Sequence, residues 1–253
     1  MMYDLQKAGI WKRMAAWMFD GILTCILAVG FGLVLSALLG YNQWNRQLNE
    51  AYAEREAEYG IRFEISQEAY EAMTEEERAN YDAAYEALIT DEETVYIYNM
   101  VLNLSLVITT LGILLAVMLW EFAIPLAFGN GQTLGKKIFG LGVIRNDGVQ
   151  MNNLQLFTRT LLGKYTIDTM VPVAIVMMLF WGITGLPGTL VLLALLAGQL
   201  LCLSLTHTNS AIHDLLAGTV VVDISSQMIF RSTEDLIAYQ KKVAADRAAR
   251  QTY

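Results

Sequence analysis

The chain has 253 residues, of which 55% are hydrophobic and 17% charged, and its mean hydropathy is +0.40. Water-soluble domains carry about 25% charged residues, so this composition indicates an integral membrane protein. The formal net charge of −8 argues against nucleic acid as a partner. Cys25 and Cys202 both lie in apolar runs, and two cysteines build neither a zinc-binding spacing nor a disulfide framework.

Four windows are long and apolar enough to cross a bilayer, which takes about 20 residues of helix. They cover residues 21–40, 101–120, 169–186 and 188–206, and none contains a charged side chain. The sequence GLPG at 185–188 separates the last two windows. Glycine beside proline punctuates helices, which favours two short spans joined by a tight turn. The alternative is a single broken or re-entrant segment.

Charge predicts the orientation of these spans. Residues 42–93 hold fifteen Asp or Glu and four Arg, a formal charge of −11. The other Lys and Arg residues lie in the N-terminal segment, in the segment after the second span and in the C-terminal tail. Because Lys and Arg near helix ends mark the cytoplasmic side, we expect both termini to be cytoplasmic and the acidic loop to lie outside.

The predicted fold is an all-α transmembrane four-span bundle, with a small cytoplasmic β-element and a helical acidic extracytoplasmic loop. The expected parts in chain order are the N-terminus with the first span, the acidic loop, the second span, a cytoplasmic hairpin with an amphipathic helix, the third and fourth spans, and a cytoplasmic strand with a helical tail. Their boundaries are 1–41, 42–94, 95–128, 129–164, 165–206 and 207–253.

Local patterns predict structure in the non-membrane parts. Thr74 and Glu77 fit a capping box, so a helix begins there. The run GVIR-NDG-VQM at 142–151 is typical of a β-hairpin, because Asn and Gly tolerate positive φ. Asn152 and Asn153 can cap an amphipathic helix that follows. The β-branched run at 219–224 predicts a strand, which we expect to join the hairpin.

Three motifs together resemble the RDD family of membrane proteins. The run IWKRMAAWMFD at 10–20 is similar to the start of that family, which is named for one arginine and two aspartates, here Arg13, Asp20 and Asp214. The run GQTLGKKIFGLGVI at 131–144 and the run HDLLAGTVV at 213–221 are similar to its second and third motifs. The long acidic loop and Gly142, where relatives are expected to carry a base, depart from the pattern. The resemblance implies a bacterial membrane protein, with transport of an unidentified ligand as its suggested role.

Charged residues at the span ends are the candidate ligand or ion sites. Arg13 and Asp20 are seven residues apart, about 10 Å along a helix, so each needs a partner on another segment. Asp20, Glu121 and Asp168 flank the apolar windows at the predicted cytoplasmic side, where they would form a cation or proton site. The alternative is that charges simply stop at helix ends. Arg13, Asp20 and Asp214 are expected to form one polar cluster at the inner face.

The second motif invites a phosphate-loop interpretation that its residues exclude. Asn130 occupies the first glycine position of such a loop, and Lys137 replaces its Ser or Thr. We expect instead a structural motif in which glycines allow close packing and Lys136 anchors the segment or pairs with an aspartate. Its structural residues are Gly131, Thr133, Gly135 and Gly140. His213 and Asp214 form either a proton-relay pair or an ordinary helix cap.

Enzyme chemistry has little support, and we expect no catalytic residue, cofactor or metal. Two histidines and no nucleophile elbow leave no recognisable active site. Two hypotheses remain. The first is an ion or small-ligand transporter of a bacterial plasma (inner) membrane. The second is a scaffold or regulatory subunit that binds a partner through its acidic loop or basic tail. The lipid bilayer is the expected environment, and a second copy of the chain or another membrane protein is the expected partner.

Overall fold

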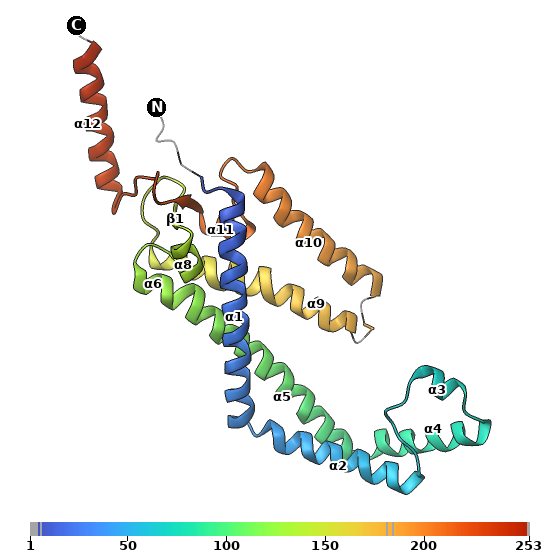
Figure 1. Ribbon diagram of the computed structural model, residues 1–253. Helices are drawn as coiled ribbons and strands as arrows, with labels where there is room; N and C mark the ends of the chain where they lie inside the picture. The colour runs from blue at the N-terminus through green and yellow to red at the C-terminus, as the bar shows by residue number, and fades with distance from the viewer. Residues whose placement is uncertain (1–4, 6, 181, 184, 252–253) are drawn as a thin grey trace. The chain divides into compact units, whose positions relative to one another are not determined.

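The computed structural model describes residues 5, 7–180, 182–183 and 185–251, and it is mainly helical (Figure 1). The expected boundaries at residue 1 and residue 253 lie outside the described residues. In chain order, the elements are α1 (Ile10–Leu38), α2 (Tyr41–Tyr59), α3 (Gln67–Glu71), α4 (Glu75–Thr90), α5 (Glu92–Val117), the π-helix η1 (Met118–Ala123), α6 (Ile124–Phe128), α7 (Leu134–Ile138), β1 (Leu141–Arg145), α8 (Asn153–Thr158), the π-helix η2 (Arg159–Met170), α9 (Val171–Phe180), α10 (Gly185–Leu205), α11 (Ile212–Ala217), β2 (Thr219–Asp223) and α12 (Thr233–Gln251).

Four helices in the described part of the chain are long and apolar enough to cross a membrane, which confirms the predicted fold class. They are Ile10–Leu38, Glu92–Phe128, Asn153–Leu179 and Gly185–Leu205. Each is an unbroken run of helical turns, since η1 and η2 continue their α-helical neighbours without a gap. The third span therefore begins within the segment expected to be a separate amphipathic helix.

The turn between the third and fourth spans comes earlier than the glycine–proline pattern indicated. Helix α9 ends at Phe180, and Gly185 already belongs to α10. Pro187 lies in the first turn of α10, where a proline is tolerated because the first N–H groups of a helix have no partner within it. The run GLPG thus opens the fourth span, and residues 181 and 184 of the connection lie outside the described residues.

The chain divides into two compact units, which are described separately: residues 1–28 with 113–253, and residues 29–112. In the smaller unit, α2 packs on α4. The capping box that opens α4 is confirmed: Glu77 N donates to Thr74 Oγ1 at 3.3 Å, and Thr74 N donates to Glu77 Oε2 at 2.9 Å. A hydroxyl and a carboxylate thus satisfy amides that the helix itself leaves unpaired.

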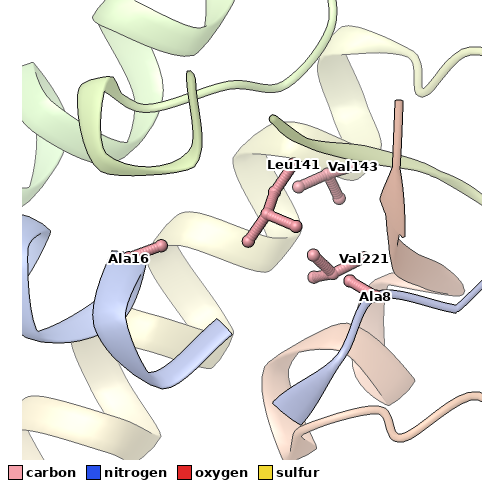
Figure 2. Close-up of a cluster of buried hydrophobic side chains, with 5 residues drawn as sticks. All are labelled: Ala8, Ala16, Leu141, Val143 and Val221. Carbon is pink, nitrogen blue, oxygen red and sulfur yellow. The ribbon is translucent and has the colours of Figure 1, made fainter. Parts of the chain in front are cut away.

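The larger unit is centred on an antiparallel pair of strands, β1 and β2, with Val143 opposite Val221. One face packs in a cluster of buried side chains, which Figure 2 shows: Ala8, Ala16, Leu141, Val143 and Val221. The other face buries Ile144 with Val220 and Val222. Because alternate strand residues point to opposite faces, these β-branched runs are covered on both sides.

The expected strand at 219–224 does pair with the first strand of the predicted hairpin. The hairpin's own second strand is reduced to single bridges, from Gln150 to Ile144 and from Val149 to Phe230. The reason is length. Asn152 is already the N-cap of α8, where its side chain accepts from Gln155 N at 2.7 Å, so few residues are left to extend a strand.

Candidate functional site

A buried carboxylate, Asp20, is the centre of the first part of the site. It lies in α1 and is only 3% exposed. Three donors from other segments reach it: Trp120 Nε1 at 3.0 Å, Thr133 Oγ1 at 2.5 Å and the backbone N–H of Gly135 at 2.8 Å. Two of these donors come from the predicted second motif, so that motif holds the first-span carboxylate in place.

Gly135 is required because two backbones meet there. A Cβ atom at this position would lie 2.6 Å from the carbonyl oxygen of Ala16 and 2.8 Å from Asp20 Oδ1. The first is a backbone atom, and the second is held in place by the hydrogen bond from Trp120 Nε1. Only glycine therefore lets α7 approach α1 closely enough for its N–H to bind the carboxylate.

A lysine ammonium lies between Asp20 and a second buried acid, Glu121 of η1. Lys136 Nζ is 3.4 Å from Glu121 Oε2, 3.9 Å from Asp20 Oδ2 and 3.1 Å from Thr133 Oγ1. The other oxygen of Glu121 pairs with Lys164 of η2. We call these four charged side chains, Asp20, Glu121, Lys136 and Lys164, the Asp20 group. Its two carboxylates and two ammonium groups balance.

A hydrogen bond at Glu121 links the π-helices η1 and η2. Pro125 has no N–H to give to the carbonyl of Glu121, four residues earlier in the helix. That carbonyl accepts a hydrogen bond from Thr160 Oγ1 at 2.9 Å, and Thr160 is fully buried. π-Helical turns are rare and occur often at functional sites. Within the described residues, η1 and η2 both carry charged members of the site.

A second buried carboxylate, Asp214 of α11, holds two arginines. Arg159 Nε donates to Asp214 Oδ1 at 2.9 Å, and Arg13 Nη2 donates to Asp214 Oδ2 at 3.1 Å. Arg13 also donates to the carbonyl of Asn209. The helix-cap interpretation of Asp214 holds as well, because Oδ2 accepts from the N–H of Ala211 at 3.3 Å. One carboxylate thus caps α11 and joins α1 to η2.

His213 connects this carboxylate to a third acid. Its Nδ1 lies 2.5 Å from Asp168 Oδ2, and its Nε2 lies 3.6 Å from Asp214 Oδ1. Gln199 of α10 donates to the other oxygen of Asp168 at 2.5 Å. Gly163 of η2 makes room for the histidine, since a Cβ there would lie 2.4 Å from His213 Cβ. We call Arg13, Arg159, Asp168, His213 and Asp214 the Asp214 group.

Burial and charge act on the titration of the members outside the spans. Burial lowers the pKa of His213, against the opposing effect of Asp214 and Asp168. Burial also lowers the pKa of Lys136 to about 8, while Glu121 opposes that shift. For Asp214, burial favours the neutral acid, yet Arg159, His213 and Arg13 outweigh it and hold its pKa far below the usual range.

The sequence-based candidates therefore fall into two groups. Arg13 and Asp214 lie together, whereas Asp20 makes its contacts with the second motif and not with either of them. Glu121 and Lys136 join Asp20, and Asp168 and His213 join Asp214. Each of Arg13 and Asp20 does take its partners from other segments, as their spacing along one helix required.

The structural residues of the second motif take distinct positions. Thr133 caps α7, where its hydroxyl accepts from Lys136 N at 3.3 Å. Gly131 has φ +67°, and a Cβ there would lie 2.9 Å from Met151 Cε. Gly140 has φ +68° at the entry to β1, and a left-handed backbone at both positions favours glycine.

Arg159 and Lys164 were missed as site residues, although each pairs with a buried acid. Arg159 lies in the segment expected to be a separate amphipathic helix, and in the structure it is 2% exposed. Their one signal in the sequence is the spacing of charged residues before an apolar span. Arg159, Lys164 and Asp168 follow one another at intervals of five and four residues there. Among the described residues, no three His, Cys, Asp or Glu side chains are close enough to hold a metal ion.

Comparison with known proteins gives one match. A family model described as the RDD family matches residues 7–218, which is most of the chain and includes both groups of charged residues. No curated protein and no solved structure matches the chain.

Proposed function

The chain belongs to the RDD family, and from that premise we propose that it transports a proton or another small cation through the Asp20 group. The observation that carries the proposal is the position of Lys136. Its ammonium lies within 4 Å of two carboxylates, Asp20 and Glu121, that are 3% and 6% exposed. The Lys136 ammonium thus occupies a position between two carboxylates. We propose that a cargo cation binds at this position by displacing the ammonium.

The proposed mechanism is exchange between that ammonium and the cargo. When Lys136 is displaced, Glu121 keeps its pair with Lys164 but Asp20 loses the one ion pair that it makes among the described residues. A buried carboxylate without a cation is strongly unfavourable, so the place is filled either by Lys136 or by cargo. Trp120, Thr133 and Gly135 fix the Asp20 carboxylate, which keeps its oxygens aimed at the exchange position while the lysine moves. Competition between a tethered and a mobile cation allows the cargo to be both bound and released.

We further propose a bacterial plasma membrane as the location, with both termini cytoplasmic. The support is the charge distribution: −11 on residues 42–93 and a surplus of Lys and Arg on the remaining segments. In that orientation, the Asp20 group lies near the cytoplasmic ends of the first two spans.

A second candidate function rests on the same charges. Each group is formally neutral and its acids are fully paired, as in a network that only ties helices together. In that case the protein is a scaffold or regulatory subunit whose acidic loop or tail helix α12 binds a partner.

Flux in proteoliposomes distinguishes the two. Protein is reconstituted with an imposed gradient of pH, Na⁺ or K⁺, and the internal ion concentration is followed with a dye. We expect flux from the unaltered protein, none from Asp20→Asn, and partial flux from Asp20→Glu. The control, Asp82→Asn, changes an exposed acid that accepts a hydrogen bond from Tyr70, and flux should be unchanged.

Lys136→Met tests the exchange step itself. Without the competing ammonium, the cargo cation should bind more tightly and leave more slowly, so KM and turnover should both fall. Full flux from well-inserted Asp20→Asn protein would contradict the carboxylate mechanism. Absence of flux above empty liposomes for every cation, in unaltered protein, would favour the scaffold.

A further inference from the structure

Two hollows open on the surface of the unit formed by residues 29–112, and Tyr52 of α2 lines both. The first has a volume of about 360 Å³ and is lined by Asn49, Tyr52, Ala53, Glu56, Phe63 and Glu64. The second has a volume of about 390 Å³. Its lining includes Tyr52, Tyr85, Leu88, Ile89, Val95 and Tyr98. Both volumes fall within the range of small-molecule clefts.

The first hollow is preformed by side chains that the protein itself holds in place. Asn49, Tyr52, Ala53 and Glu56 repeat at helical spacing, so they share one face of α2. Phe63 is fixed opposite them, because its N–H donates to Glu56 Oε1 at 2.7 Å. The rings of Tyr52 and Phe63 are 5.6 Å apart at 78°, which forms an aromatic corner.

The chemistry of this corner favours a cation. Aromatic ring faces attract ammonium groups, and the attraction is strongest for alkylated ammonium ions that lose little hydration. Glu56 and Glu64 add carboxylates to the same lining. The surrounding segment, residues 42–93, has a formal charge of −11, which concentrates cations and repels anions at its surface.

The second hollow shares Tyr52 with the first but is chemically different. Leu88 is buried and Ile89 and Val95 add aliphatic surface, while Tyr85 and Tyr98 add rings. Such a lining accepts an apolar group. The side chains come from α2, α4 and the first turns of α5, so three helices contribute to the hollow.

We propose that this unit binds a small amphiphilic organic cation. Its alkylated ammonium head lies against Tyr52 and Phe63, beside Glu56 and Glu64, and its apolar body lies in the second hollow. The site is independent of the Asp20 group and of any transport through it.

The test is calorimetric titration of the full-length protein in neutral detergent at low salt. The probes are tetramethylammonium, butyltrimethylammonium and hexyltrimethylammonium. Each methylene that enters the second hollow should tighten binding up to about fourfold. Hexyltrimethylammonium should therefore bind at least tenfold more tightly than tetramethylammonium. The uncharged analogue 3,3-dimethylbutan-1-ol should not bind.

Variants then assign the binding to the two hollows. Tyr52→Leu should weaken hexyltrimethylammonium at least tenfold, and Glu56→Gln with Glu64→Gln should weaken all charged probes. The matched control is Tyr96→Leu, which removes an exposed tyrosine of the same unit that packs on Trp44 and lines neither hollow. Its affinity should be unchanged.

Other outcomes overturn the proposal. Binding that does not saturate, that survives Tyr52→Leu, or that is equal for the uncharged analogue would show that no such site exists. A preference for basic peptides over every small probe would assign the acidic surface to a protein partner instead. Asp20→Asn protein should bind the probes with unchanged affinity. The binding test therefore remains valid even if the transport proposal is wrong.

Discussion

Asp20 and Asp214 are both buried carboxylates, yet their partners differ in kind. Asp214 is held by two guanidinium groups, which stay charged at all accessible pH values. Asp20 is held by an indole, a hydroxyl and a backbone N–H, and its ion-pair partner is the ammonium of Lys136, 3.9 Å away. The Asp214 group therefore has the composition of a permanent link between helices, whereas the Asp20 group is the one for which we propose cation exchange.

The close contact at Gly135 gives a prediction about stability. Gly135→Ala places a methyl group 2.6 Å from the Ala16 carbonyl, so α7 must move away from α1 and its N–H leaves Asp20. Overpacking of this kind costs about 1–3 kcal/mol. The melting temperature of the protein in detergent should fall by several degrees. The control is Gly21→Ala, where nothing lies within 4 Å and a helical alanine is favourable. Equal melting temperatures for the two variants would refute the tight-contact argument.

Residue chemistry predicted which side chains need partners but not which partners they find. The spacing of Arg13 and Asp20 showed that neither can satisfy the other. Arg13 then pairs with a residue 201 positions away, and Thr133 reaches Asp20 across 113 positions. Which partner each side chain finds depends on how distant segments pack together. No local sequence pattern shows that packing. Of the three residues expected in one cluster, Arg13 and Asp214 are in direct contact, and Asp20 takes its partners elsewhere.

At the scale of elements, the two π-helices bring the charged residues of the site into contact. A π-turn carries more than four residues, so side chains along it leave the regular α-helical face. In η2, this places Arg159 toward Asp214 and Lys164 toward Glu121. Thr160 lies between them in the sequence, and its hydroxyl donates a hydrogen bond to the Glu121 carbonyl. Pro125 cannot donate to that carbonyl because it has no N–H.

Thr160→Val tests this tie between η1 and η2. Valine keeps the shape of threonine but removes the donor, so the buried Glu121 carbonyl loses a hydrogen bond. The expected loss of stability is about 1–3 kcal/mol. The control on the same helix is Thr166→Val. Its hydroxyl is exposed and bonds the Leu161 carbonyl of its own helix, so we expect little change. Thermal unfolding followed by circular dichroism measures both, and a Thr166→Val loss as large as that of Thr160→Val would contradict the argument.

Elements with local signals were predictable from the sequence, and those without such signals were not. The caps at Thr74 and Asn152 carry their own donors and acceptors, and both form as expected. No composition marks a π-turn, because it differs from an α-turn only in which carbonyl each N–H selects. The second strand of the hairpin is cut short because Asn152 already caps α8, while the β1–β2 pair buries three consecutive valines of β2.

For the whole molecule, the decisive quantity is the unequal distribution of charge along the chain. An acidic segment of −11 between the first two spans, with basic residues in the segments on their other ends, predicts one orientation in the membrane. Four spans are consistent with both termini on the same side.

Cysteine labelling tests that orientation directly. Cys25 and Cys202 are first replaced by alanine, because both are free thiols. Single cysteines then replace Glu76, in the acidic loop, and Asp147, in the turn after β1; both positions are exposed. An impermeant maleimide should label position 76 in intact cells, and position 147 only after the cells are opened. Because the Asp20 group lies on the same side as position 147 in this orientation, the reverse labelling pattern would place the cation-exchange position at the outer face and invert the direction of every proposed step.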